Sequence, residues 1–362
     1  MFTTEAIKHA DACRFCWMCR HICPVGQVTG KEGNNARPKG LLVSLDHRGI
    51  PLDESAMEVM YECTLCRGCA QHCETGWDPV IYILEARTKG VVEDLLPPNV
   101  KAVLDRALEG NAIPLEESKA VTDAVAALPE KADVLVYLGE TARKKQEKIA
   151  LAFLDLMKKT GTDFTVLKEE PQSGALLGEL MGYVEDVKKV AQVCADKCKE
   201  AGAKTIVVLD ESDAAFMKHQ WAEWQLFDGA VTTATAFLAD AIEKGSLKPG
   251  KVELRACYHD PAKIAREIEE TEPARKIMAA MGIDLHELYR SRKTTKSCGG
   301  TLLPLTNPKM TAMVADGRLG DIRFAGENAV ITSTPTAFDN FSMVEQDDIK
   351  IEDLFVMLDS VC

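Results

Sequence analysis

The segment Cys13-Arg-Phe-Cys16-Trp-Met-Cys19-Arg-His-Ile-Cys23-Pro24 spaces its cysteines as C-x2-C-x2-C-x3-C. The segment Cys63-Thr-Leu-Cys66-Arg-Gly-Cys69-Ala-Gln-His-Cys73-Glu74 repeats that spacing, with Glu74 in place of the proline. Three cysteines at this spacing wrap a loop around one iron–sulfur cubane, and the fourth is a ligand of the other cubane. The two runs therefore predict two [4Fe–4S] clusters that exchange one ligand each.

This rule assigns the ligands of both clusters. Cluster 1 is predicted to be held by Cys13, Cys16, Cys19 and Cys73, and cluster 2 by Cys63, Cys66, Cys69 and Cys23. Trp17 and Met18 lie between ligands, and we expect them to shield cluster 1 from solvent. Zinc is a poorer explanation, because one zinc site takes four ligands and would leave the other thiols without a role.

Composition narrows the class of protein. The chain has 362 residues, which is long enough for two or three domains, and a net charge of -13, which disfavours nucleic acid as a partner. The first ten residues contain no apolar signal-peptide core, so a disulfide framework is not expected. No apolar run approaches the roughly 20 residues that span a bilayer, so we expect a cytoplasmic protein that meets a membrane only through a partner.

The region around the two runs is predicted to be helical. Between them lie a basic, glycine-containing segment at 35–40, which is expected to be a loop, and the apolar stretch 41–45, and helices are expected at 53–62 and 81–87. The prolines at 97 and 98 break this pattern. We therefore expect a helical two-cluster ferredoxin domain over 1–98, followed by a helical linker over 99–130.

From residue 131 the pattern changes to short apolar strands that alternate with amphipathic helices, which is typical of α/β units with a parallel sheet. The order of elements occurs twice, which predicts a first repeat at 131–245 and a second at 246–362, related by a pseudo-twofold axis. The first repeat has expected strands at 133–138, 163–167 and 205–209 and helices at 143–159 and 185–201. The second has expected strands at 252–256 and 328–332 and a helix at 262–281.

Two cysteine runs followed by a duplicated α/β domain resemble the family of the D-type iron–sulfur subunits of heterodisulfide reductases. The iron–sulfur subunits of anaerobic glycerol-3-phosphate, glycolate and lactate dehydrogenases are related to it. Tyr258-His-Asp-Pro261 is similar to the His-Asp-Pro-Cys motif of the family, and Ser297-Cys-Gly-Gly300 is similar to its Cys-Cys-Gly. This resemblance covers nearly the whole chain and implies a duplicated cysteine-rich (CCG-type) domain.

The departures from the family motifs concern cysteines. Ala262 and Ser297 stand where the motifs have cysteine, and Gln172-Ser-Gly174 replaces the Cys-Cys-Gly of the first repeat. Thr334-Pro-Thr-Ala337 and Asp210-Glu-Ser-Asp213 occupy the places of Cys-Pro-x-Cys. The resemblance implies a further, non-cubane cluster where these cysteines are present, so we predict that no such cluster forms here.

Several cysteines outside the runs have two interpretations. Cys257 and Cys298 either form a residual metal or redox pair in the crevice of the α/β domain or, as we favour, are buried inert thiols. Cys194 and Cys198 share one helix face, and one of them is expected in the core. Cys362 lies at the end of the sequence and is expected to be mobile.

Other side chains have a structural as well as a functional interpretation. His259 and Asp260 are predicted to cap the helix that begins near Pro261 rather than to act as an acid–base pair. Trp221 and Trp224 offer either a docking surface for a flavoprotein or a core contact. No G-x-G-x-x-G follows a strand, so flavin or nicotinamide is expected on another subunit.

The favoured function is that of an iron–sulfur electron-transfer subunit of an oxidoreductase complex. Single electrons would pass through the two clusters between a flavoprotein partner and a redox acceptor. In this interpretation the chain has no catalytic residues of its own. Two alternatives are an enzyme that reduces a heterodisulfide, another disulfide or a quinone at the α/β crevice, and a regulatory iron–sulfur sensor.

Overall fold

Polar caps and prolines determine where the amino-terminal helices begin in the computed structural model, which describes residues 2–362. The side chains of Thr3 and Asp53 accept hydrogen bonds from the backbone N–H groups of Ala6 and Ala56. Asp78 caps a helix whose first residue is Pro79, where the missing N–H of proline costs nothing. That helix extends beyond the predicted 81–87, and the helix predicted at 53–62 is present.

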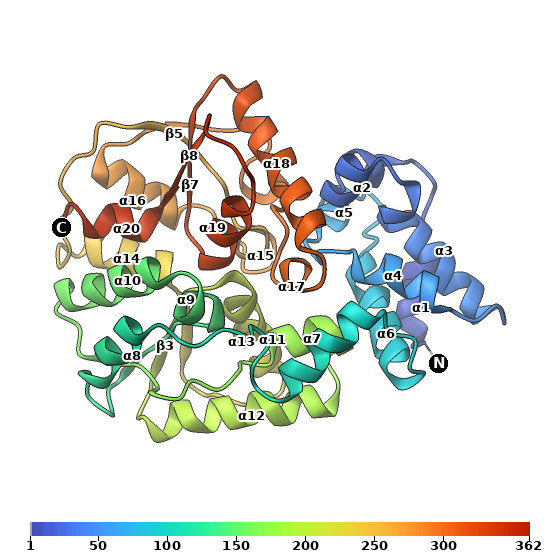
Figure 1. Cartoon of the computed structure of the whole chain (residues 1–362), viewed down its shortest axis with the longest axis horizontal. Coiled ribbons are helices and arrows are strands. Elements are labelled where there is room, and N and C mark those ends of the chain that lie inside the picture. Colours follow the sequence, from blue (N-terminus) through green and yellow to red (C-terminus); the bar gives the residue numbers. More distant parts are fainter. Residues whose placement is uncertain (1) are drawn as a thin grey trace.

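The helical domain contains the two cysteine runs (Figure 1, blue and light blue). Its elements are α1 (Thr4–Asp11), η1 (Met18–His21), α2 (Pro24–Thr29), η2 (Glu32–Asn34), α3 (Ala36–His47), α4 (Glu54–Tyr61), α5 (Gly68–Gln71) and α6 (Pro79–Val92). The apolar stretch at 41–45 lies inside α3. Residues 36–40 also belong to this helix, so the prediction of a loop at 35–40 was wrong. The segment that follows contains α7 (Pro98–Leu108) and α8 (Lys119–Ala126), as expected for a helical linker.

Two parallel four-stranded sheets follow, and their strand orders correspond. The first sheet has the order β2-β1-β3-β4 and the second β6-β5-β7-β8, so each begins with its second strand. The strands are β1 (Val134–Tyr137), β2 (Phe164–Thr165), β3 (Thr205–Val208), β4 (Ala230–Thr233), β5 (Arg255–Tyr258), β6 (Asp284–His286), β7 (Ala329–Thr332) and β8 (Lys350–Asp353). The predicted mixed α/β class and its duplication are thereby confirmed.

Three boundaries differ from the prediction. The strand expected at 252–256 begins only at Arg255, because pairing with β6 starts at the pair Arg255–Asp284. The helix expected at 262–281 is divided by a turn in which Glu269 has a φ of 61° and after which Pro273 starts a new helix. The helix expected at 143–159 is likewise two helices, separated at Lys145 and Gln146.

The helices of the repeats cover both sheets. In the first repeat they are α9 (Glu140–Lys144), α10 (Glu147–Lys159), α11 (Ala175–Met181), α12 (Glu185–Glu200), α13 (Glu211–Glu223) and α14 (Ala234–Glu243). In the second they are α15 (Ala262–Arg266), α16 (Pro273–Met281), η3 (Arg292–Thr294), α17 (Leu303–Thr306), α18 (Pro308–Phe324), α19 (Pro335–Ser342) and α20 (Leu354–Asp359).

The contact between the repeats has the pattern of a twofold axis. By position in the repeat, α10 corresponds to α16 and α14 to α20, and the packed pairs are α10 with α20 and α14 with α16. Such a reciprocal contact is what an isologous interface produces. Phe153 of α10 meets Phe355 of α20 edge-to-face at 5.2 Å between ring centroids. Lys159–Asp359 and Glu243–Lys276 form ion pairs across the same seam.

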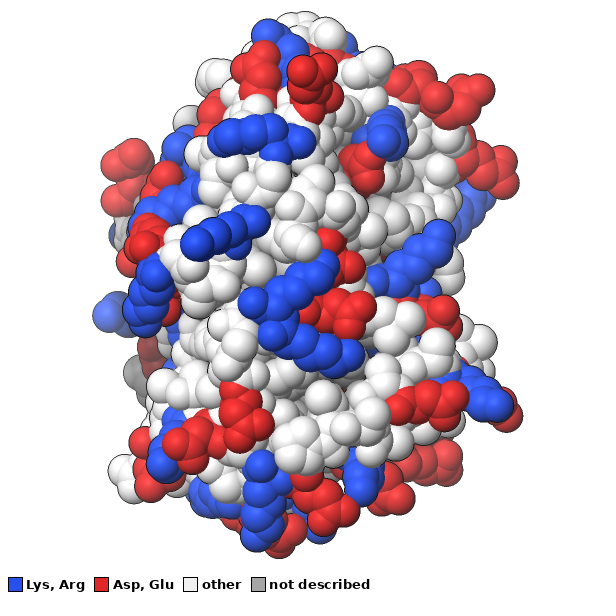
Figure 2. Space-filling model, turned by 90° about the vertical axis from the view of Figure 1, so that its left-hand side faces the viewer, with Lys and Arg blue, Asp and Glu red and all other residues white. Residues whose placement is uncertain are grey.

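The surface of the repeats farthest from the helical domain carries mixed charge. On this face Lys and Arg side chains interleave with Asp and Glu over the whole view (Figure 2). A face of this kind offers no extended area of one sign to a nucleic acid. Among residues 2–362, no helix combines the length and the apolar composition that crossing a membrane requires.

Candidate metal centre

The two cysteine loops have the same unusual backbone. Phe15 and Trp17 flank the second cysteine of the first run with φ values of 55° and 66°, and Leu65 and Arg67 flank Cys66 with 51° and 53°. Each of these residues has a steric cost of about 1–2 kcal/mol in the left-handed region. The gain is a loop whose successive N–H groups point inward, which is the arrangement that binds anions, including iron–sulfur clusters. Phe15 N, for example, donates to Cys13 Sγ at 3.4 Å.

One cavity collects four cysteines from both runs. Cys23 of the first run lines it together with Cys63, Cys66 and Cys69 of the second. Cys23 reaches this position because it is the N-cap of α2, where its Sγ accepts a hydrogen bond from Gly26 N at 3.4 Å. The rest of the lining is largely apolar, with Ile22, Pro24, Val25, Pro79 and Ile83 among its members. The cavity is therefore formed by the four residues predicted to hold cluster 2.

Burial opposes ionisation of these thiols. It raises the pKa of Cys23 to about 11 and the pKa of Cys69 well above its usual value. A thiol becomes a metal ligand only as thiolate, so a strong local positive charge must be supplied on binding, as iron does. An all-thiol donor set in an apolar cavity fits an iron–sulfur cubane.

The residues predicted to hold cluster 1 lie nearer the surface. Cys16 is exposed and Cys13 and Cys19 are half-buried. Burial raises the pKa of Cys19 above its usual value. Cys73 follows α5, with its Sγ 3.2 Å from Thr75 Oγ1, and its assignment to cluster 1 stays a prediction.

The surroundings of the first loop differ from the prediction in one respect. Trp17 and Met18 are 40% and 51% exposed, so they do not close this loop off from solvent. The Trp17 ring is instead covered by the guanidinium of Arg37, 3.8 Å from the ring centroid. A cluster held here would have one edge near the surface.

Two arginines that the sequence analysis missed hold the second loop in place. Arg87 is fully buried and donates to Cys63 O at 2.7 Å, to Met60 O at 2.9 Å and to Glu179 O at 2.6 Å. Arg266 of α15 donates to Cys66 O and to Thr295 O. The sequence signal for Arg87 was a cation at the end of the largely apolar first half of α6.

Within residues 2–362, no three or more His, Cys, Asp or Glu side chains are grouped so as to hold a metal ion. Ligands of a cubane stand around four irons rather than one and are therefore farther apart than those of a zinc ion.

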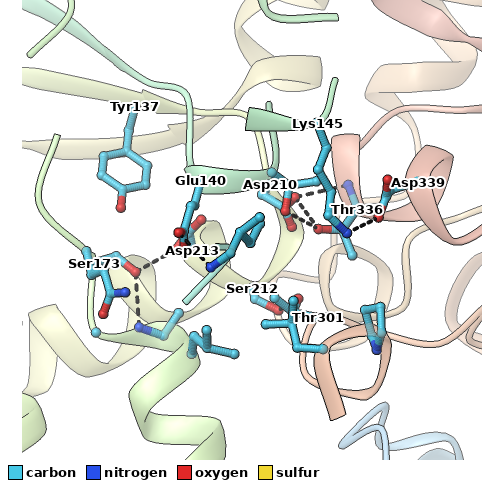
Figure 3. Close-up of a pocket in the computed structure, with 18 residues that line it drawn as sticks. Tyr137, Glu140, Lys145, Ser173, Asp210, Ser212, Asp213, Thr301, Thr336 and Asp339 are labelled. Atoms are coloured by element: carbon cyan, nitrogen blue, oxygen red, sulfur yellow. Dashed lines mark hydrogen bonds and ion pairs between the residues drawn. The ribbon is translucent and has the colours of Figure 1, made fainter. Parts of the chain in front are cut away.

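The first-repeat positions that replace the family's cysteines, at 172–174 and 210–213, line a crevice between the two repeats (Figure 3). The first repeat contributes Ser173, Gly174, Asp210 and Asp213 to the lining. The second repeat adds five residues to the lining, Thr301, Pro304, Leu305, Thr336 and Asp339. The cavity has a volume of about 60 Å³ and no cysteine in its lining.

Hydrogen bonds occupy several oxygen atoms in this crevice. Ser173 Oγ donates to Asp213, and the backbone and hydroxyl of Thr336 donate to Asp210. Burial, with the charge of Asp210, raises the pKa of Asp213 to about 8. Carboxylates and hydroxyls are not the donors of an iron–sulfur cluster, so the crevice does not fit one.

The remaining cysteines are mostly core residues. Cys257 and Cys298 are 0% and 2% exposed within one apolar cluster, and burial raises the pKa of both thiols. Cys194 and Cys198 are both fully buried, so both thiols pack in the core where one was expected. Cys362 is exposed.

The capping role predicted for His259 and Asp260 is also wrong. No side chain caps α15, and Asp260 instead receives two hydrogen bonds from Arg275. His259 packs edge-to-face against Phe341, and its burial lowers its pKa well below the usual value. Trp221 is a core residue whose Nε1 donates to Ser173 O.

Comparison with known proteins agrees with this arrangement. Residues 9–77 match the 4Fe-4S dicluster domain, so the amino-terminal region is an iron–sulfur domain. The chain is 26% identical to the D-type subunit of the dihydromethanophenazine:CoB--CoM heterodisulfide reductase from Methanosarcina acetivorans, over 98% of this chain and 95% of that protein.

Two further relatives are longer than this chain. A probable membrane-anchored ferredoxin of Chromohalobacter salexigens is 25% identical over 92% of the chain, which spans 56% of that protein. The EtfAB:quinone oxidoreductase of Syntrophomonas wolfei is 22% identical over 82% of the chain, which spans 49% of that protein. The resemblance predicted from the cysteine runs is confirmed: the chain is a relative of the D-type heterodisulfide reductase subunits along nearly its whole length, with an iron–sulfur domain at residues 9–77.

Proposed function

We propose that this chain is an electron-transfer subunit that relays single electrons through two [4Fe–4S] clusters between a flavoprotein partner and a redox acceptor. The observation that carries the proposal is the cavity in which Cys23 of the first run meets Cys63, Cys66 and Cys69 of the second. Ligands exchanged between runs keep two clusters close together, and such clusters pass one electron at a time.

The ligand sets we propose are those of the two runs. Cys63, Cys66, Cys69 and Cys23 would hold cluster 2, and Cys13, Cys16, Cys19 and Cys73 would hold cluster 1. The exposure of Cys16, Phe15 and Met18 supports the first loop as the side from which a redox partner approaches. Arg87 and Arg266 fix the second loop against the repeats.

The partners follow from the relatives and from what this sequence lacks. The relatives include one named as a subunit of a larger oxidoreductase and one named for EtfAB and quinone, so partner subunits are expected. We propose a flavoprotein as one partner because no dinucleotide-binding motif occurs here. A cytoplasmic location is part of the same proposal.

Iron analysis and one substitution test the proposal. Anaerobically purified protein should contain about eight iron atoms per chain, four for each cubane. Cys66→Ser should remove or damage cluster 2 and stop electron passage to the acceptor, while the partner flavin is still reduced. Electron passage at the rate of the unsubstituted protein would overturn the proposal.

Cys298→Ser is the matched control because this thiol is buried outside both loops. It should leave iron content and electron passage unchanged. Iron clearly above eight per chain that falls on this substitution would instead support chemistry in the α/β domain.

A further inference from the structure

The basic segment 35–40 lies between the cysteine runs and brings one cation to each loop. Arg37 covers Trp17 and Phe15 at the surface loop, with its guanidinium 3.8 Å and 5.0 Å from their ring centroids. Lys39 lines the cavity formed by the predicted cluster 2 ligands. Neither residue belongs to a ligand set.

Lys39 is a buried cation without a carboxylate partner. It is 1% exposed, and its Nζ donates to Asn34 O at 2.6 Å and to Gly33 O at 3.4 Å. Among residues 2–362, no Asp or Glu oxygen lies within the 4.0 Å that defines an ion pair with it. Glu32 and Glu62, which belong to neighbouring segments, contact Arg20 and Asn34 instead.

Burying an ammonium group in this way is costly unless an anion compensates it. The side of Lys39 that faces the cavity provides a place for one. Asn34 O accepts from Lys39 Nζ and also lies 3.5 Å from Cys23 Sγ, so the cation and a predicted cluster ligand meet at one carbonyl oxygen. A cubane with four thiolate ligands carries the negative charge that the cavity otherwise lacks.

We propose that Lys39 is the counter-charge of cluster 2 and raises its reduction potential. This inference rests on the proposed two-cluster function. Adding an electron makes the cluster more negative, and a fixed positive charge in an apolar cavity stabilises that reduced state more than the oxidised one. The effect is specific to cluster 2, because Arg37 lies at a loop that is open to solvent, which screens its charge.

The test uses the whole chain, purified anaerobically, with the reduction potentials of both clusters measured by EPR-monitored titration. Lys39→Gln removes the charge and keeps a hydrogen-bond donor for Asn34 O. It should lower the potential of cluster 2 by about 59 mV or more, which is a tenfold change in a one-electron equilibrium. The potential of cluster 1 should change much less, and Lys39→Arg should keep cluster 2 near its original value.

Lys89→Met is the control, since this lysine of the same domain is already paired with Asp46 and Glu93. It should leave both potentials unchanged. A cluster 2 potential in Lys39→Gln equal to that of the unsubstituted protein overturns the inference.

Cluster content distinguishes the remaining outcomes. If Lys39→Gln retains only cluster 1 while Lys39→Arg retains both, the charge is needed to hold cluster 2, which supports the inference. If both variants lose cluster 2, the side chain has only a structural role and the inference is wrong. Absence of a second cluster from the unsubstituted protein would contradict the proposed function itself.

Discussion

At the scale of single residues, Arg87 shows how one side chain joins the iron–sulfur domain to the repeats. Its planar fork donates to carbonyl oxygens of two segments of the helical domain and to Glu179 O of α11. The guanidinium also lies 4.8 Å from the ring centroid of Tyr61. Lysine, with one compact charge, cannot serve several carbonyls in one plane.

Arg87→Met should therefore destabilise the protein and loosen the second loop. Carbonyl oxygens left buried without a donor cost roughly 1–3 kcal/mol each, so we expect a total loss of several kcal/mol. Thermal unfolding of the anaerobic protein measures this loss, and the EPR signal of cluster 2 should disappear before that of cluster 1 on heating. The exposed Lys101→Met should have almost no effect. Equal thermal unfolding midpoints for Arg87→Met and the unsubstituted protein would show that Arg87 does not stabilise the second loop.

At the scale of an element, the first turn of α13 brings buried carboxyl groups together. A helix N-terminus favours negative charge, but here burial is the stronger effect. Burial raises the pKa of Glu211 to about 7 and that of Asp213 to about 8. Asp210, Glu170 and Glu179 raise the pKa of Asp213 further, while Ser173 lowers it by donating a hydrogen bond.

These raised values predict how stability depends on pH. The folded protein keeps protons that the unfolded chain has already released, so stability is greatest at low pH and is lost as pH rises from about 4 towards 8. One such group changes the free energy of unfolding by ~1.4 kcal/mol per pH unit within that window. Denaturant midpoints measured between pH 5 and 8 should therefore fall with pH, and Asp213→Asn should reduce the slope. Asp228→Asn, in an exposed loop, should leave it unchanged.

At the scale of the whole molecule, the helical domain is seated on both repeats. Tyr61 Oη donates to Leu180 O at 2.6 Å in the first repeat. Arg290 Nη2 of the second repeat donates to His21 O at 2.9 Å. One apolar core runs from α1 and α6 through α7 into α11, α12 and α13. The covalent linker is therefore not what holds the parts together.

Cutting the linker should leave the molecule assembled. A protease site inserted between Pro114 and Glu116, which are exposed, would separate the helical domain from the repeats in sequence. After cleavage the two fragments should co-elute in gel filtration and retain their iron. Separation of the fragments in mild buffer would show that the interface between the helical domain and the repeats is weaker than its contacts indicate.

Much of this protein is determined by local sequence. Cysteine spacing predicts the iron–sulfur loops, and alternating apolar strands and amphipathic helices predict the repeats, because ligand reach and side-chain periodicity act over a few residues. Only the tertiary structure divides the long helices of the repeats and buries Lys39 and Arg87. Those outcomes depend on partners far away in the chain, whose desolvation and hydrogen bonding no local pattern specifies.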